Sequence, residues 1–533
     1  MISADNVNHA TSHCAVTLRA GSTWRPGATD AQSQAGEGKS QVQIFKLLRQ
    51  VSDYSLGSLL VTLAGLVSFP ILTRVLGVDD YGNMSLVAVT LSFLVAFGKF
   101  GLQHSAIMFY SETRAGNNAW SLQQYYPTLL GGMLMTGTLV TGGWLMLTVL
   151  ADRLFFDYPG IVDIFILVAP LILVRVLQSV MNSILRARER SGTVAIYAVL
   201  WRYVNLGLVI PALLMIEASL RAFFIATLVA EVLVLAMMVV SVLKGQPLDM
   251  RRFSTPMFRA MLLFGLPMLG YEVAGVLGSM GDRYVIKLML GAEELGKYSA
   301  AYNLCEYVSA IIVASLASAI LPMYLRIWSE KGKEKTEAFI AASLRLYVFA
   351  AFPIAAGMAA VADDFIAIMA SPVYREGSVI VPWVIIGMMV DGAIIMLAAG
   401  LYIQKKSRVL MLSLGASAFI NIALNLVLVP LMGIEGAAIA TLASFAFYAW
   451  IAWRYSSRHL AIPLPWRQCL RYGAFSLAMY WLVESVTMDG VWLSLATKVS
   501  VGALFYLALV WLLDPESKNM LALYRRRNDV DQA

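Results

Sequence analysis

Cysteine, histidine and charge are scarce in this chain of 533 residues, and each scarcity excludes a class of protein. The three cysteines, Cys14, Cys305 and Cys469, are far apart and lack CxxC spacing, which argues against a disulfide framework and a zinc site. The four histidines lie outside the centres of the apolar segments, so none is placed for acyl transfer inside a membrane. Charged residues make up 14% and hydrophobic residues 59%. Because a soluble protein could not bury so much apolar surface, the composition predicts a membrane protein.

Long apolar runs fill most of the chain. A helix needs roughly 20 apolar residues to cross the ~30 Å hydrocarbon core, and about fourteen stretches meet that need, so we expect an all-α polytopic membrane protein. The predicted spans are 54–76, 83–105, 127–150, 160–183, 192–216, 218–243, 259–281, 298–322, 339–361, 376–401, 408–432, 434–455, 468–486 and 490–513. The short connections leave no room for a nucleotide-hydrolysing or glycosyltransferase domain.

Basic residues between the spans indicate the topology. Lys and Arg gather in alternate connections, such as 186–190, 326–335 and 405–408, and such residues accumulate on the cytoplasmic side. We therefore expect both termini to face the cytoplasm. The net charge of +7 is then a topology signal and gives no reason to expect nucleic acid as a partner. Residues 1–40 are rich in small and polar residues and are predicted to be a disordered cytoplasmic tail without a signal peptide.

The two halves of the chain repeat each other. Leu76-Gly77 with Tyr81-Gly82 recurs as Leu290-Gly291 with Leu295-Gly296, at an offset of 214 residues. A second landmark, at 211–218, is echoed at 430–437 in the same order. Repeats in polytopic membrane proteins build two bundles that rock against each other around a central site. The pattern predicts a transporter.

The repeat also predicts the domain organisation. Each repeat supplies a lobe of six helices, and the last two spans are additional. The predicted units are a cytoplasmic tail at 1–43, a first lobe at 44–245 with spans 1 to 6, a second lobe at 246–460 with spans 7 to 12, spans 13 and 14 at 461–515, and a cytoplasmic tail at 516–533.

Two segments of the sequence resemble a known superfamily. FPILTRVLGVDDYGNMSL, within 53–86, and GLPMLGYEVAGVLGSMGDRYVIKLMLGAEELGKYSAAYNL, within 264–304, are similar to the first and seventh helices of Wzx-type flippases. These form the polysaccharide-export branch of the multidrug/oligosaccharidyl-lipid/polysaccharide (MOP) exporter superfamily. The likeness in span count and order extends from about residue 44 to 515. It implies two six-helix lobes around a V-shaped cavity, with spans 13 and 14 outside them.

The resemblance also implies a function. It predicts a flippase of the bacterial inner membrane that translocates an undecaprenyl-pyrophosphate-linked oligosaccharide by alternating access, without covalent chemistry or a cofactor. The expected partners are that lipid-linked oligosaccharide, membrane lipids and a polysaccharide polymerase with its export machinery. The alternatives within the superfamily are a lipid II flippase and a cation-coupled drug antiporter. A membrane polymerase or acyltransferase is the alternative from another class, and the short outer loops count against it.

Basic residues inside the spans are candidates for binding the pyrophosphate, because the planar fork of arginine suits phosphate oxygens. They are Arg202 with Asn205 one turn further on, Arg283, Lys287 and Arg175. Other interpretations remain open. Arg202 could form a buried salt bridge with Glu231, Arg283 and Lys287 could be interfacial anchors, and Arg175 could pair structurally or snorkel.

Isolated carboxylates inside the spans are candidates for ion coupling. Glu272, Glu306 and Asp391 lie in the second half and Glu231 in the first. A carboxylate at membrane depth is unfavourable without a cation, a proton or a cavity. We therefore expect H⁺ or Na⁺ to bind one of them during transport.

Overall fold

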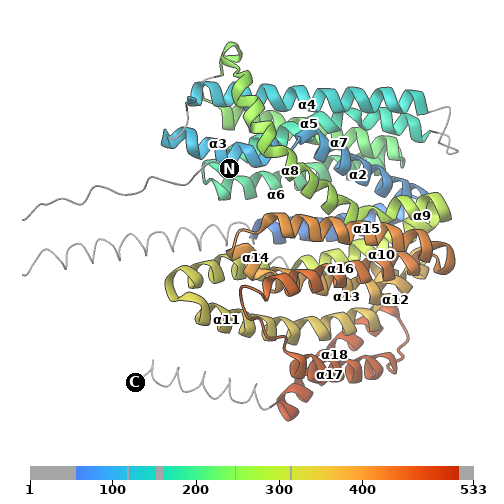
Figure 1. Cartoon of the computed structure of the whole chain (residues 1–533). Helices are drawn as coiled ribbons and strands as arrows, with labels where there is room; N and C mark the ends of the chain where they lie inside the picture. Colours follow the sequence, from blue (N-terminus) through green and yellow to red (C-terminus); the bar gives the residue numbers. More distant parts are fainter. Residues whose placement is uncertain (1–55, 117–118, 152–159, 247, 312–314, 515–533) are drawn as a thin grey trace, which may run out of the picture. The chain divides into compact units, whose positions relative to one another are not determined.

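The computed structural model describes residues 56–116, 119–151, 160–246, 248–311 and 315–514, and every regular element in these ranges is a helix (Figure 1). The all-α prediction is therefore confirmed. The predicted tails at 1–43 and 516–533 lie outside the described residues, and the division of the remainder into lobes stays a prediction.

The first half consists of a helix at Leu56–Val75 followed by the elements up to residue 243. These are α2 (Val78–Lys99), α3 (Leu102–Ala115), α4 (Leu122–Ala151), α5 (Ile161–Ala187), α6 (Ser191–Pro211), the π-turn η1 (Ala212–Ile216) and α7 (Leu220–Leu243).

The second half begins with the short turn η2 (Met250–Arg252) and ends with two additional long helices. Its elements are α8 (Thr255–Met280), α9 (Asp282–Leu290), α10 (Ala292–Ser309), α11 (Ser315–Ala360), α12 (Ala362–Met369), η4 (Pro372–Ile380), α13 (Val381–Leu397), α14 (Ala399–Ile403), α15 (Ser407–Met432), α16 (Ile434–Ser456), α17 (Trp466–Glu484) and α18 (Val491–Leu513).

Twelve of the described helical segments are long and apolar enough to cross a membrane. The two remaining predicted spans, 298–322 and 468–486, have no counterpart of their own among the twelve. The first falls on α10 and the start of α11, and the second on α17. Several acidic and basic side chains lower the hydropathy of α10. The described residues therefore contain twelve candidate spans, where the sequence predicts about fourteen.

Positive φ in the backbone interrupts one predicted helix, and elsewhere it marks a boundary between two predicted spans. The predicted span 83–105 was wrong as a single helix, because Phe100 and Gly101 have φ of 46° and 70° and separate α2 from α3. Only glycine fits at position 101, since a Cβ there would lie 1.9 Å from the carbonyl oxygen of Gly265 on α8. Gly332, with φ of 75°, divides α11 into two helices.

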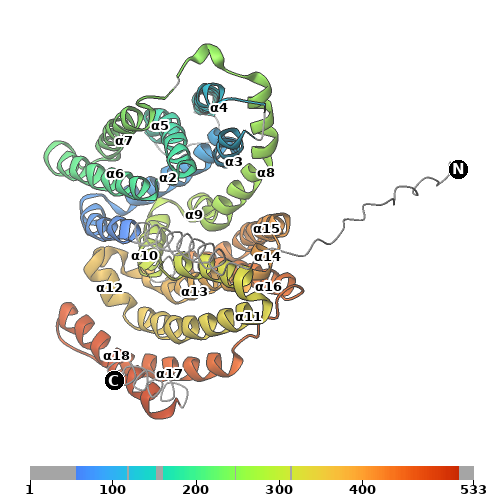
Figure 2. The same ribbon diagram turned by 90° about the vertical axis from the view of Figure 1, so that its left-hand side faces the viewer.

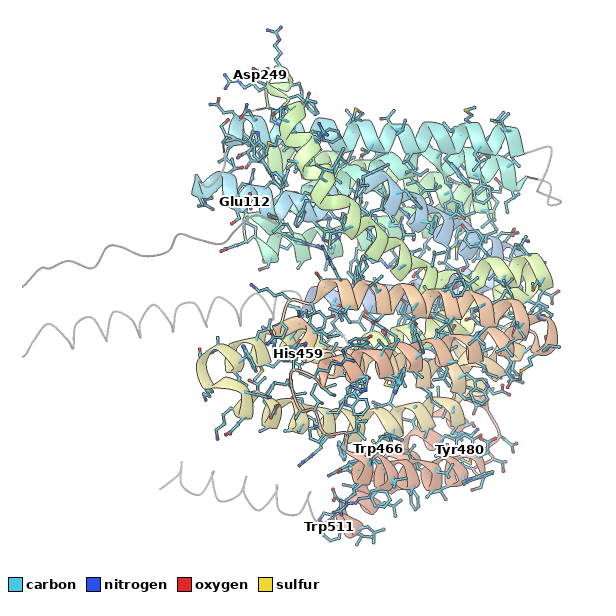
Figure 3. The ribbon with its side chains drawn as sticks, viewed as in Figure 1. Glu112, Asp249, His459, Trp466, Tyr480 and Trp511 are labelled. Atoms are coloured by element: carbon cyan, nitrogen blue, oxygen red, sulfur yellow. The ribbon has the colours of Figure 1, made fainter. Side chains whose placement is uncertain are left out.

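Buried side chains and exposed apolar side chains both fit a membrane protein. One core cluster packs α3, α4, α5 and α7 together, and another joins α11, α17 and α18, which lie side by side in both views (Figures 1 and 2). Exposed tryptophans, including Trp466 and Trp511, mark the outer surface of α17 and α18 (Figure 3). Leu139 and Leu504 are about two thirds exposed, at 68% and 69%, as expected for side chains that face lipid.

Candidate functional site

The two copies of the sequence repeat pack directly against each other. Gly82 lies on α2 and Gly296 on α10, and these helices cross at their shortest side chains. A Cβ on Gly82 would lie 2.1 Å from the carbonyl oxygen of Ala292, and a Cβ on Gly296 would lie 2.2 Å from that of Val78. The repeated glycines therefore allow backbone to meet backbone where the first half contacts the second.

Two serines extend this contact with the same symmetry. The hydroxyl of Ser299 donates to that of Ser85 over 2.9 Å, and the two residues are 214 positions apart, the offset of the repeat. We call Gly82, Ser85, Gly296 and Ser299 the glycine seam. Tyr81 beside it is buried, and its hydroxyl accepts from Asn303 over 3.0 Å. The seam holds no ionisable side chain, so only separation of the two helices can open it.

Arg202 lies on α6 beside residues from both halves of the chain. Its Nη2 donates to Ser68 over 3.4 Å, and its guanidinium lies beside Tyr307 on α10. Its Nε is buried and has no acceptor among the described residues. Asn205, one turn further along α6, likewise has a buried amide nitrogen without a described partner. The predicted pair Arg202 and Asn205 therefore combines buried position with unused hydrogen-bond donors.

Arg283 is buried, at 2% exposure, in the first turn of α9. Its guanidinium stacks 4.9 Å from the centre of the Tyr302 ring, and Nη1 points to the carbonyl oxygen of Ser279 at 3.5 Å. Its Nε also has no acceptor in the described part of the chain. Burial rules out an interfacial anchor for Arg283. Lys287, one turn later, is half-buried.

Arg175 and Glu231 form an ion pair inside the first half. Arg175 on α5 donates from Nε and Nη2 to the carboxylate of Glu231 on α7, with distances of 2.8 to 3.1 Å. Glu231 is fully buried. The alternative partner predicted for Glu231, Arg202, is therefore wrong. An Arg175 side chain neutralised in this way is a weaker candidate for binding a phosphate than Arg202 or Arg283.

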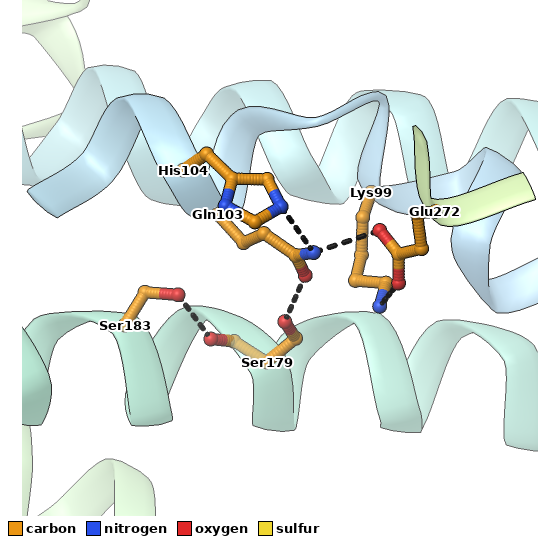
Figure 4. A network of polar contacts seen from close by, with 6 residues as sticks. All are labelled: Lys99, Gln103, His104, Ser179, Ser183 and Glu272. Carbon is orange, nitrogen blue, oxygen red and sulfur yellow. Dashed lines mark hydrogen bonds and ion pairs between the residues drawn. The ribbon is translucent and has the colours of Figure 1, made fainter. Parts of the chain in front are cut away.

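Glu272 lies on α8 in a polar network that links the two halves (Figure 4). Its carboxylate forms an ion pair with Lys99, at the end of α2, and accepts from Gln103 over 2.7 Å. Gln103 in turn contacts His104 and accepts from Ser179 on α5. Sequence reasoning missed Lys99, although Gln103 follows it at i+4 within predicted span 2 and was the signal available.

Glu306 and Asp391 are exposed carboxylates on α10 and α13. Glu306 makes no ion pair with a described residue, but it lies close enough to Arg283 and Tyr302 to interact with both electrostatically. Asp391 interacts electrostatically with three tyrosines, one each from α8, α14 and α16: Tyr271, Tyr402 and Tyr448. Neither carboxylate is therefore held by a fixed salt bridge in this part of the structure.

A buried oxygen cluster that the sequence did not single out lies where α9, α15 and α16 meet. Asp282 is 1% exposed and accepts from Tyr298 over 2.5 Å, and Thr441 lies 3.5 Å from it. Asn425 donates to the backbone of Asn421 over 2.8 Å. Asp282 Oδ1 and Asn425 Oδ1 are buried and have no donor among the described residues. Two buried oxygens without donors suit a cation or a proton. The available signals were the Asp282-Arg283 pair and the shared face of the two asparagines.

A second feature is a cavity of about 630 Å³ between α11, α13 and α17. Its lining is almost wholly apolar and includes Val348, Ile386, Met389 and Leu477. Sugars and phosphates find few partners there, whereas a hydrocarbon chain would be well accommodated.

Comparison with known proteins identifies the family of this chain. The family model described as "Polysaccharide biosynthesis protein" matches residues 71–378, more than half of the chain. The chain belongs to this family. The matched residues include the glycine seam, Arg202, Arg283, Glu272 and Glu306. The succinoglycan biosynthesis transport protein ExoT of Rhizobium meliloti (strain 1021) is 21% identical over 299 residues, which span 56% of this chain and 57% of that protein.

Solved transporters share the fold of this family member. A lipid II flippase MurJ, in an inward closed conformation, superposes with a TM-score of 0.70 at 14% identity, covering 86% of this chain and 97% of its own. An inward-facing multidrug resistance transporter of the MATE family, in the MOP superfamily, gives 0.60 at 15%, covering 75% and 94%. The predicted membership of the MOP exporter superfamily is confirmed, and these relatives are transport proteins, not enzymes.

Proposed function

We propose that this protein is a flippase that moves an undecaprenyl-diphosphate-linked oligosaccharide across the bacterial inner membrane for polysaccharide export. The observation that supports it most directly is the pair Arg202 and Arg283. The two residues come from different halves, both contact α10, and each has a buried Nε–H without a described acceptor. A diphosphate would supply acceptors to both, and its charge would compensate the two guanidinium groups.

The apolar cavity supports a substrate with a long lipid chain. Because α17 forms one wall of the cavity, the first of the two helices added after the repeat has a role in this proposal. Part of an isoprenoid chain would occupy the cavity while the headgroup enters between the two halves. Such an arrangement would let the chain stay in an apolar environment throughout translocation.

We propose that transport is coupled to H⁺ or Na⁺. The buried oxygens of Asp282 and Asn425 are the best placed for the ion, because they have no donor in the described structure. Glu272, Glu306, Asp391 and Glu231 remain candidates. Of these, Glu231 and Glu272 already have basic partners, which makes the exposed Glu306 and Asp391 the stronger pair. Binding a cation at Asp282 beside Arg283 would raise the local positive charge and so favour the anionic headgroup.

In the proposed cycle the glycine seam closes the periplasmic end, and its separation releases the headgroup there. The same proposal places both termini in the cytoplasm and the protein beside a polymerase that consumes the flipped unit. In this structure the seam is closed, and the proposal assigns it to the state in which the headgroup enters from the cytoplasmic side.

A lipid II flippase is the second candidate, because the superposition on MurJ covers 97% of that protein. The substrate would again be a polyprenyl diphosphate, so binding by Arg202 and Arg283 does not distinguish the two candidate functions. A drug antiporter fits less well, since 75% of this chain is covered by the MATE transporter and a basic site does not suit cationic drugs.

The test is transport by the purified protein in liposomes, with an undecaprenyl-diphosphate-linked oligosaccharide, lipid II and a cationic dye as competing substrates. We expect the oligosaccharide to be translocated. Arg202→Lys and Arg283→Lys should each reduce apparent affinity by roughly 10- to 150-fold, from loss of a charge-assisted bond of about 1.5–3 kcal/mol. Arg221→Lys, on the exposed start of α7, is the matched control. Transport of the dye alone, or unchanged transport in both variants, would overturn the proposal.

A further inference from the structure

Three arginines converge on a polar pocket at one end of the first half. The pocket has a volume of about 440 Å³ and is lined by the ends of α3, α4, α5 and α7. It lies at the end of α3 near Glu112, which is labelled in Figure 3. We call Arg114, Arg188 and Arg190 with this cavity the arginine pocket. Tyr110, Tyr126, Leu122 and Gln246 complete its lining.

The structure holds Arg188 in a fixed orientation. Nη1 donates to the carbonyl oxygen of Val242 over 3.0 Å, and Nη2 donates to the Tyr126 hydroxyl over 2.8 Å. The guanidinium also stacks 5.2 Å from the centre of the Tyr126 ring. Tyr126 itself is buried. The side chain therefore forms a rigid base for the pocket, with donor capacity left for a ligand.

The arginines of the pocket have no carboxylate partner in the described structure. None of the three arginines forms an ion pair with a described carboxylate, and no acidic residue lines the cavity. Arg252 and Arg326, in contrast, pair with Asp249 and Glu330. Leu122 begins the 30-residue helix α4, so the positive end of its dipole adds to the field.

We propose that the arginine pocket binds the phosphate headgroup of an anionic membrane lipid. It lies where several membrane-crossing helices end, which is the depth of lipid headgroups. Three guanidinium groups without carboxylate partners match the charge and oxygens of a phosphate. The site is separate from Arg202 and Arg283 and does not depend on which substrate the protein transports.

Two classes of lipid could supply this phosphate, namely an anionic phospholipid or undecaprenyl diphosphate, and the experiment separates them. The purified protein is placed in nanodiscs of phosphatidylcholine alone, with phosphatidylglycerol, with cardiolipin, or with undecaprenyl diphosphate, and retained lipid is counted by native mass spectrometry. We expect phosphatidylglycerol or cardiolipin to be retained over phosphatidylcholine. Preferential retention of undecaprenyl diphosphate would still support the pocket, and would identify it as an entry point for the substrate.

The variants separate binding from topology and from folding. Arg114→Gln with Arg190→Gln changes two exposed side chains and should weaken retention by roughly 10-fold or more. Arg188→Lys keeps the positive charge on which the membrane topology depends but removes the planar set of guanidinium donors. This variant should therefore bind the lipid less well than wild type. Arg326→Gln is the control. Equal lipid retention in wild type, the double variant and the control would overturn the proposal. So would displacement of the lipid by inorganic diphosphate to the same extent in all three proteins.

Discussion

Two contacts between the halves of the chain differ in their chemistry. At the glycine seam, Gly82 and Gly296 bring backbones together without any ionisable group. At the other contact, Lys99 and Glu272 meet through charged side chains, assisted by Gln103. The first depends on shape and is either closed or open. The second depends on charge and can be weakened by protonation or by an added cation. A transporter that alternates between two states needs both an all-or-none contact and one that an ion can influence.

The largest effect is expected at the seam. Gly82→Ala or Gly296→Ala places a Cβ about 2 Å from a carbonyl oxygen, so α2 and α10 must separate. We expect transport to fall more than tenfold, because one state of the cycle is lost. Export assays and thiol labelling of a cysteine near the seam measure it. Gly142→Ala, where a Cβ meets nothing within 4 Å, is the control. Normal transport in both seam variants would contradict a closed seam.

The next effect is expected at Lys99 and Glu272. Lys99→Met leaves a largely buried carboxylate without its cation and should destabilise the protein by about 3 kcal/mol. The double variant with Glu272→Gln should recover most of that loss. Thermal unfolding of the two single variants and the double variant forms a mutant cycle. Additive losses would show that the ion pair does not act between the halves.

A smaller and more specific effect is expected at Asp282. Asp282→Asn removes the charge but keeps the size of the side chain, so transport should continue with a weakened response to an imposed Na⁺ or pH gradient. Glu306→Gln and Asp391→Asn are compared in the same liposomes. If Asp282→Asn keeps the wild-type response to the gradient and one of the other variants loses it, the ion site is assigned to that other residue instead.

The smallest effect concerns Asp364 on α12. Burial raises the pKa of this carboxyl, but hydrogen bonds from Ser494 and Lys498 outweigh burial and hold the pKa below its ordinary value of 3.8. The stabilisation is therefore present above pH 3.8 and is lost as the pH falls through the folded pKa. Asp364→Asn should lower stability at neutral pH by less than about 1 kcal/mol and flatten the acid limb of the melting profile. An unchanged acid limb would contradict this.

The sequence predicted the helices well because each span is a local property of about 20 residues. The boundaries between α6 and α7 and between α15 and α16, which depend on short links, were also correct. The break at Gly101 was not foreseen, since its cause is the approach of Gly265, which is distant in the sequence.

The candidate site was predicted only in part, because partners between helices cannot be read from one helix. The sequence singled out Arg202, Arg283 and Glu272, and the structure shows that all three are at least partly buried at contacts between elements. It did not foresee that Glu231 pairs with Arg175, and it passed over Asp282. The sequence repeat related Gly82 to Gly296, but it did not predict that these glycines meet or that Ser85 and Ser299 extend the contact.

The most direct test of the account is to lock the glycine seam. With Cys14, Cys305 and Cys469 replaced by serine, Ser85→Cys and Ser299→Cys place two thiols where the hydroxyls now lie 2.9 Å apart. We predict that oxidation forms a disulfide and stops transport of the lipid-linked oligosaccharide, and that reduction restores it, with each single variant unaffected by oxidant. Full transport by the oxidised, cross-linked protein would contradict the claim that this seam must open.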